Sequence, residues 1–255
     1  MVFLLALFFV LGASVGSFLN VVIDRSIQGR TLTGRSYCDW CGRTLEVADL
    51  VPIVSFLVIR GRCRKCRKPL SWQYPAVEGL GGIIFLLTFW KFSGGGDFSL
   101  PFLIYLLFIC STLIAVAAVD FKTSLIPTSF VFGAALAALF FNFFSKSSPD
   151  FIGFVAAAFG AAAFFAVIIF LTRGRGMGEG DAVLAFLIGM VLGVPGSIIA
   201  IFLAFFIGAV AAVFLVVLGK KRFGQTIPFG PFLILGFFVS LFFGQEILRY
   251  YLMLY

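Results

Sequence analysis

Residues 100–120 read LPFLIYLLFICSTLIAVAAVD, an apolar run that ends in an acidic residue. The hydrocarbon core of a bilayer is about 30 Å thick, and about 20 apolar residues in a helix cross it. The run therefore predicts a membrane-spanning helix with Asp120 at its C-terminal end. An ionisable group at the edge of a span costs free energy, so Asp120 is a candidate functional residue.

Similar apolar runs recur through the 255-residue chain, of which 62% is hydrophobic and only 12% charged. Roughly a quarter of the residues of a water-soluble domain are charged. The first run lacks the basic start of a secretory signal, so we interpret it as a retained helix. We predict an all-α polytopic membrane protein with about eight transmembrane helices, near residues 2–23, 76–91, 100–119, 127–144, 151–172, 181–195, 197–218 and 229–251.

Lys and Arg are distributed unevenly between the predicted loops. Segment 24–75 carries ten of the 19, and alternate later loops carry six more, at positions 122, 173, 175 and 220–222. The positive-inside rule then makes segment 24–75 cytoplasmic and both termini periplasmic. The net charge of +8 reflects this topology. We expect no nucleic-acid partner, because the basic segment lacks interleaved stacking aromatics.

Four cysteines in segment 24–75 form two CxxC pairs, Cys38–Cys41 and Cys63–Cys66. This spacing can present four thiolates to one Zn²⁺, which would leave no open position and would therefore be structural. Two disulfides are the alternative, which a reducing cytoplasm disfavours. A redox role is a further alternative, although no thioredoxin-like βαβ pattern surrounds either pair. We therefore predict a small cytoplasmic zinc-binding domain.

A second acid, Asp181, opens a predicted helix after alternating glycines, since residues 173–181 read RGRGMGEGD. Gly178 and Gly180 supply a backbone that another segment can approach closely. The third predicted span runs inward and the sixth outward, so Asp120 and Asp181 face the same, cytoplasmic, side. The alternative for Asp181 is a capping residue at a helix N-terminus.

Two carboxyl groups that share a site hold one proton between them, so one can act as general base while the other acts as general acid. This chemistry needs neither metal nor histidine, and the chain contains no His. The absence of His excludes Ser-His-Asp and Cys-His mechanisms. The predicted catalytic pair is Asp120 and Asp181. Glu78, near the start of the second span, is either an interfacial charge or part of a second activity.

Several motifs in one order resemble the bacterial type IV prepilin peptidases, also called prepilin leader peptidase/N-methyltransferases, which are GxGD-type aspartic proteases. The resemblance covers nearly the whole chain. Its motifs are GSFLNVVIDR at 16–25, the double CxxC loop, YPAVE at 74–78, Asp120 followed by Ile126-Pro127, MGEGD at 177–181 and PFGP at 228–231. Two positions depart from the usual pattern, Thr128 where members often carry Asp and Val183 where they often carry Lys.

The resemblance implies that Asp120 and Asp181 are the catalytic dyad of a multi-pass enzyme of the bacterial inner membrane. It implies removal of the leaders of prepilins and pseudopilins at the cytoplasmic face. It also implies N-methylation of the new terminus with S-adenosylmethionine, an activity usual in members with the four-cysteine loop and to which Glu78 could be related. The expected domains are a first helix at 1–23, a zinc-binding domain at 24–75 and a seven-helix peptidase domain at 76–255.

Two alternatives belong to other functional classes. A proton-coupled transporter could use the membrane acids as a relay, but its acids are expected near the bilayer midplane. A peptidase-only intramembrane protease of the presenilin type shares Gly-x-Gly-Asp, but its Pro-Ala-Leu string is missing and Pro228-Phe-Gly-Pro231 stands near that place.

Overall fold

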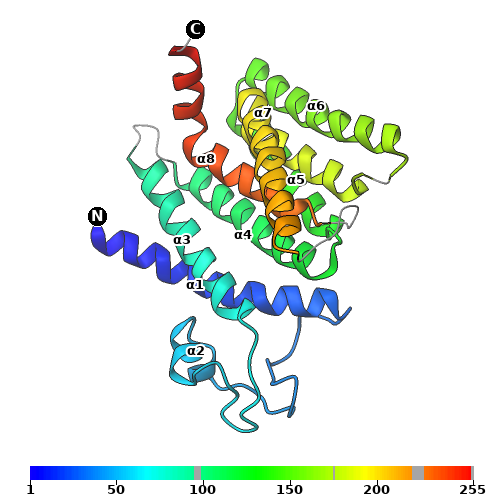
Figure 1. The fold of residues 1–255 in the computed structure, drawn as a ribbon. Coiled ribbons are helices and arrows are strands. Elements are labelled where there is room, and N and C mark those ends of the chain that lie inside the picture. Colours follow the sequence, from blue (N-terminus) through cyan, green and yellow to red (C-terminus); the bar gives the residue numbers. More distant parts are fainter. Residues whose placement is uncertain (95–98, 175, 220–226, 254–255) are drawn as a thin grey trace. The chain divides into compact units, whose positions relative to one another are not determined.

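The structure is a computed structural model that describes residues 1–94, 99–174, 176–219 and 227–253. The described residues form helices only, apart from two isolated bridges (Figure 1). The basic residues at 175 and 220–222, used above to predict orientation, lie outside them. The helices are α1 (Val2–Ile27), η1 (Val47–Asp49), α2 (Val54–Val58), α3 (Gln73–Ser93), α4 (Leu100–Thr123), α5 (Thr128–Ser145), α6 (Ser148–Thr172), α7 (Glu179–Val217) and α8 (Gly230–Met253).

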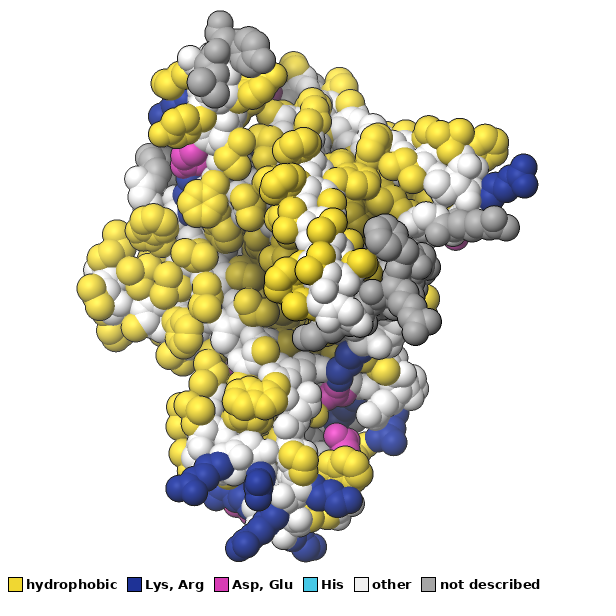
Figure 2. Space-filling model, in the orientation of Figure 1, with side chains coloured by type: hydrophobic (Ala, Val, Ile, Leu, Met, Phe, Trp, Pro, Cys, Tyr) yellow, Lys and Arg dark blue, Asp and Glu magenta, His cyan; other side chains and the backbone are white. Residues whose placement is uncertain are grey.

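Seven of the described helices are long and apolar enough to cross a membrane, namely α1 and α3 to α8. The all-α polytopic prediction is thereby confirmed. The predicted spans 181–195 and 197–218 correspond closely to the two legs of α7, a 39-residue element that breaks at Gly193, where φ is 70°. Figure 2 shows mainly hydrophobic side chains on the visible face of the helices, while Lys and Arg gather over the loop between α1 and α3.

The chain divides into two compact units, Met1–Ala118 and Val119–Tyr255. In the first unit α1 packs along α3. The contact is close because glycines face each other: a Cβ at Gly12 would lie 2.3 Å from the carbonyl oxygen of Gly81. A Cβ at Gly16 would lie 2.7 Å from the Cα of Glu78. Small residues at such positions let helix backbones approach within a membrane.

In the second unit α7 packs against α5, α6 and α8. The leg of α7 before the break contacts α6, since Gly189 faces the backbone of Ala157. The leg after the break contacts α8, where Gly236 faces the backbone of Ala200. The break thus lets the two legs of α7 pack against different neighbours.

Backbone groups at the break of α7 are hydrogen-bonded by side chains from neighbouring helices. Pro195 has no N–H, so it cannot donate within the helix. The buried amide of Asn142, on α5, donates to the carbonyl oxygen of Met190 at 2.7 Å. The hydroxyl of Ser240, on α8, donates to the carbonyl oxygen of Gly196 at 2.7 Å. Such bonds are what allow a broken helix within a bilayer, where water cannot satisfy the backbone.

Candidate active site and metal centre

Asp120 lies in the last turn of α4, within the second unit, and is only 3% exposed. Its carboxylate lies against Gly230, the first residue of α8, whose backbone N–H donates to it. The approach is so close that a Cβ at Gly230 would lie 2.4 Å from Oδ2 of Asp120. That Oδ2 atom is buried and accepts no hydrogen bond from the described residues. Asp120 therefore presents one oxygen that the fold itself does not use.

Asp181 lies in the first turn of α7 and is 7% exposed. Its Oδ2 accepts a hydrogen bond of 3.1 Å from the backbone N–H of Gly178, the residue that precedes the helix. The capping role that the sequence leaves open for Asp181 is thus present. It fixes the orientation of the side chain by one oxygen and is compatible with a second role for the carboxylate.

The start of α7, which carries Asp181, and the start of α8, which contacts Asp120, both pack on Ile126, in the segment between α4 and α5. A Cβ at Gly180 would lie 2.8 Å from the Cβ of Ile126, and one at Gly230 would lie 3.3 Å from its Cδ1. Ile126 is therefore packed between the starts of α7 and α8. The carboxylates of Asp120 and Asp181 are close enough to repel each other. Two largely buried acids from separate helices can share a proton and act as an acid–base pair.

The four cysteines of the first unit converge with all four sulfur atoms within 4.8 Å of one another. The Sγ atoms of Cys38 and Cys66 are 3.9 Å apart, and those of Cys41 and Cys63 are 4.0 Å apart. Four sulfurs at about 2.3 Å from a tetrahedral Zn²⁺ are about 3.8 Å apart, so the cluster fits this ion. All four thiols are free, which does not support the disulfide alternative.

Each cysteine pair lies in a knuckle, and the two knuckles repeat one hydrogen-bond pattern 25 residues apart. The N–H of Cys38 donates to the carbonyl of Arg43, and that of Cys63 donates to the carbonyl of Lys68. The isolated bridges Tyr37–Thr44 and Arg62–Pro69 repeat at the same offset. In the second knuckle the N–H groups of Cys66 and Lys65 donate to the Cys63 sulfur and lower the pKa of that thiol to about 6. A thiolate at neutral pH is the form that binds a metal.

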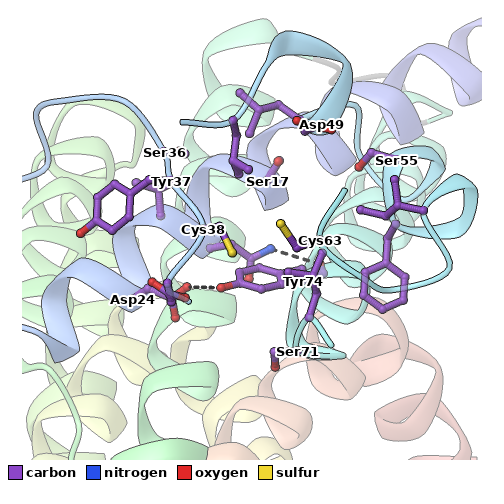
Figure 3. A pocket seen from close by; sticks show the side chains of 18 of the residues that line it. Ser17, Asp24, Ser36, Tyr37, Cys38, Asp49, Ser55, Cys63, Ser71 and Tyr74 are labelled. Carbon is purple, nitrogen blue, oxygen red and sulfur yellow. Dashed lines mark hydrogen bonds between the residues drawn. The ribbon is translucent and has the colours of Figure 1, made fainter. Parts of the chain in front are cut away.

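Beside the knuckles, the start of α3 carries Glu78, which is 7% exposed. Its Oε2 accepts a hydrogen bond of 2.7 Å from the backbone N–H of Ile53. One turn earlier, the hydroxyl of Tyr74 donates to Oδ2 of Asp24, on α1, at 3.0 Å (Figure 3). Glu78 therefore does not project as an interfacial charge. It lines one cavity of the first unit together with Asp24, Tyr74, Cys38 and Cys63.

Comparison with known proteins bears on both units. Residues 10–92 match the bacterial peptidase A24 N-terminal domain, and residues 106–213 match the type IV leader peptidase family. A protein of Bacillus subtilis (strain 168) named "Prepilin leader peptidase/N-methyltransferase" is 34% identical over 98% of this chain and 98% of its own length. The chain belongs to the type IV leader peptidase family.

Other relatives within the type IV leader peptidase family carry the same name. One from Burkholderia pseudomallei (strain 1026b) is 32% identical over 98% of this chain and 88% of its own length. One from Pseudomonas putida is 27% identical over 93% of this chain and 90% of its own length. No solved structure matches the chain.

Residues other than those expected also build the carboxylate site of this leader peptidase family member. Gly230 and Ile126 belong to motifs of the sequence and also build the site: Gly230 contacts Asp120, and Ile126 packs between Gly180 and Gly230. Glu179, which stands within the glycine run, is exposed. The Gly178 N–H donates to Asp181, and Gly180 packs on Ile126.

Proposed function

We propose that the chain is a membrane aspartic endopeptidase that removes the leader peptides of prepilins and pseudopilins. The observation that carries the proposal is the meeting of Asp120 and Asp181, two largely buried acids from separate helices. The names of its full-length relatives support the substrate class. The positive-inside distribution of Lys and Arg supports an active site at the cytoplasmic face of the bacterial inner membrane, with both termini periplasmic.

In the proposed reaction one Asp takes a proton from a water molecule while the water oxygen bonds to the scissile carbonyl carbon. The other Asp, protonated, gives its proton to the carbonyl oxygen. The C–N bond then breaks as the departing amine takes up a proton from one Asp, and a hydroxyl of the tetrahedral intermediate returns a proton to the other Asp as the new carboxyl group forms. The Gly178 N–H would hold Asp181 in place through this sequence, and the Gly230 N–H would hold Asp120.

The test replaces each acid by its amide. Asp120→Asn and Asp181→Asn should each reduce cleavage of purified prepilin by about 10³-fold or more, because neither amide can exchange a proton with water or substrate. Glu179→Gln, an exposed acid two residues before Asp181, is the matched control and should cleave normally. Normal cleavage by either Asp variant, after insertion into the membrane, would remove the assignment.

We also propose that the chain N-methylates the new N-terminus with S-adenosylmethionine, and that a structural zinc ion is bound by Cys38, Cys41, Cys63 and Cys66. The relatives' names support the first activity and the sulfur distances support the second site. A peptidase-only enzyme is the alternative. An assay with radiolabelled S-adenosylmethionine distinguishes the bifunctional enzyme from the peptidase-only enzyme. A pilin that is cleaved but not labelled would show that the chain has peptidase activity alone.

The proposed domain organisation follows the chemistry. Residues 1–23 form the first span, 24–75 the zinc-binding domain and 76–255 the peptidase domain. The position of the four cysteines within the first unit supports a distinct role for the loop.

A further inference from the structure

The first unit contains a cavity of about 500 Å³ between α1, the two knuckles and the start of α3 (Figure 3). Its walls combine apolar surface with many polar and charged side chains, and Cys38 and Cys63 belong to the wall. Small-molecule sites in proteins are typically clefts or cavities of about 300–1,000 Å³, and this cavity falls in that range. None of the peptidase residues lines it, since Asp120, Asp181 and Gly230 belong to the second unit.

Two carboxylates line this cavity from opposite helices, Asp24 on α1 and Glu78 on α3. The lining contains four acids, Asp24, Asp39, Asp49 and Glu78, and three arginines, Arg25, Arg43 and Arg64, so its formal charge is negative. Arg64 pairs with Asp49 at 2.6 Å, and the guanidinium of Arg25 donates to backbone carbonyls such as that of Thr33 at 2.7 Å. Carboxylates on the wall of a partly enclosed cavity favour a ligand with positive charge, because the charge is less screened there than in water.

Glu78 also holds an unusual backbone conformation at the cavity. Ile53 has φ 62° and ψ −51°, and the N–H of Val54 donates to the carbonyl of Pro52 at 2.5 Å, which makes a γ-turn. This conformation is rare, and it is strained for a β-branched residue. The carboxylate of Glu78 accepts the N–H of Ile53, and Leu50 and Ser55 on either side of the turn line the cavity. Strained turns held by their surroundings are concentrated at ligand sites.

We propose that this cavity binds S-adenosylmethionine, with the carboxylates of Asp24 and Glu78 facing its positively charged sulfonium end. The inference rests on the N-methyltransferase activity proposed above. Tyr37 and Trp40 also line the cavity, each with a basic side chain over one ring face, Arg30 and Lys68 respectively. In the transfer, the bond between sulfur and the methyl carbon breaks and its electrons stay on sulfur. The lone pair of the pilin amine forms the new N–C bond, and the methylated amine releases a proton to solvent.

The test compares two ligands that differ in charge. S-Adenosylhomocysteine lacks the methyl group and has a neutral sulfur, so carboxylates that recognise the sulfonium should not affect its binding. In equilibrium dialysis with the purified full chain, Glu78→Gln should weaken S-adenosylmethionine binding by about tenfold or more. Binding of S-adenosylhomocysteine should change less than about threefold, because the glutamine oxygen can still accept the N–H of Ile53. Asp24→Asn should act in the same direction.

Two further variants fix the location. Val21→Trp fills the cavity from α1 and should weaken both ligands at least tenfold. Asp150→Asn, an exposed acid in the first turn of α6, should change neither. If Glu78→Gln weakens the binding of both ligands equally, Glu78 has only a structural role and sulfonium recognition is overturned. If Val21→Trp leaves both affinities unchanged, the proposed location of the site is overturned.

The proposed N-methyltransferase activity and the proposed binding site can be refuted independently. A wild-type chain that transfers no methyl group to pilin refutes the N-methyltransferase activity. A wild-type chain that methylates pilin, with variants that bind both ligands normally, refutes only this site.

Discussion

Gly230 begins α8 with no side chain, and the Asp120 carboxylate occupies the space where one would lie. Its N–H donates to that carboxylate, so the glycine both admits and orients the acid. An alanine at this position must displace either the carboxylate or the start of the helix. The geometry of a catalytic acid is sensitive to such shifts, because about 1 Å of misplacement can cost about a hundredfold in rate.

We therefore predict that Gly230→Ala lowers the rate of leader cleavage by about a hundredfold while the protein still inserts in the membrane. Gly153→Ala is the control, because nothing lies within 4 Å of a Cβ at Gly153. The measurement is kcat/KM on purified prepilin for both variants. A Gly230→Ala enzyme as active as the control would show that Asp120 needs no such space.

For single residues, the two acids could be predicted from the sequence, but the residues that hold them in position could not. Asp120 and Asp181 stand out because a charge at the end of an apolar run is costly and needs a reason. The role of Gly230 could not be predicted, because it depends on contact between residues 110 positions apart. The link between Glu78 and Ile53 is of the same kind, since neither residue type indicates a γ-turn.

Among the elements, α7 depends most on its neighbours. Its break at Gly193 would leave backbone groups unpaired in a bilayer, and Asn142 and Ser240 supply hydrogen bonds there. The string Gly193-Val194-Pro195-Gly196 made the break visible in the sequence, which is why two spans were expected there. That Asn142 on α5 would bond near it was not predictable, because an Asn inside an apolar run can point to any neighbouring helix.

We predict that Asn142→Leu destabilises the protein by about 1 kcal/mol, because the carbonyl of Met190 loses its buried donor. Thermal unfolding in detergent micelles provides the measurement. Thr112→Val is the control, since the hydroxyl of Thr112 bonds only to the carbonyl of Phe108 in its own helix. Equal stability of the two variants would mean that the Asn142 bond contributes nothing.

For the whole molecule, the two units contain different chemistry. The cysteine cluster and the cavity lie within Met1–Ala118, whereas the carboxylate pair lies within Val119–Tyr255. The boundary between the two units falls inside α4, between Ala118 and Val119. Nothing in the apolar sequence of this helix indicates it. The cysteine loop, by contrast, was recognisable from spacing alone, because paired CxxC motifs are specific for a four-thiolate site.

We predict that the purified chain contains one zinc ion and that Cys38→Ser removes it, because three thiolates bind Zn²⁺ less tightly than four. Cys110→Ser is the control, since Cys110 is buried in α4 and does not belong to the cluster. Elemental analysis of protein purified without affinity metals measures both. Full zinc content in Cys38→Ser would exclude the four-thiolate site.

The distribution of charge also predicts the orientation of the whole chain. Alkaline phosphatase, which is active only outside the cytoplasm, should be active when fused after Lys146, between α5 and α6. It should be inactive when fused after Ser124, between α4 and α5. The reverse pattern would place the carboxylate pair on the periplasmic side.

The duplicated knuckle has a consequence for how the loop responds to metal supply. Each half, with its own bridge and turn, offers two thiolates, and neither half can complete a tetrahedral shell alone. Binding of the one ion therefore joins both halves at once. The fraction of chains with an ordered segment between α1 and α3 should then follow the saturation curve of a single site as free zinc rises.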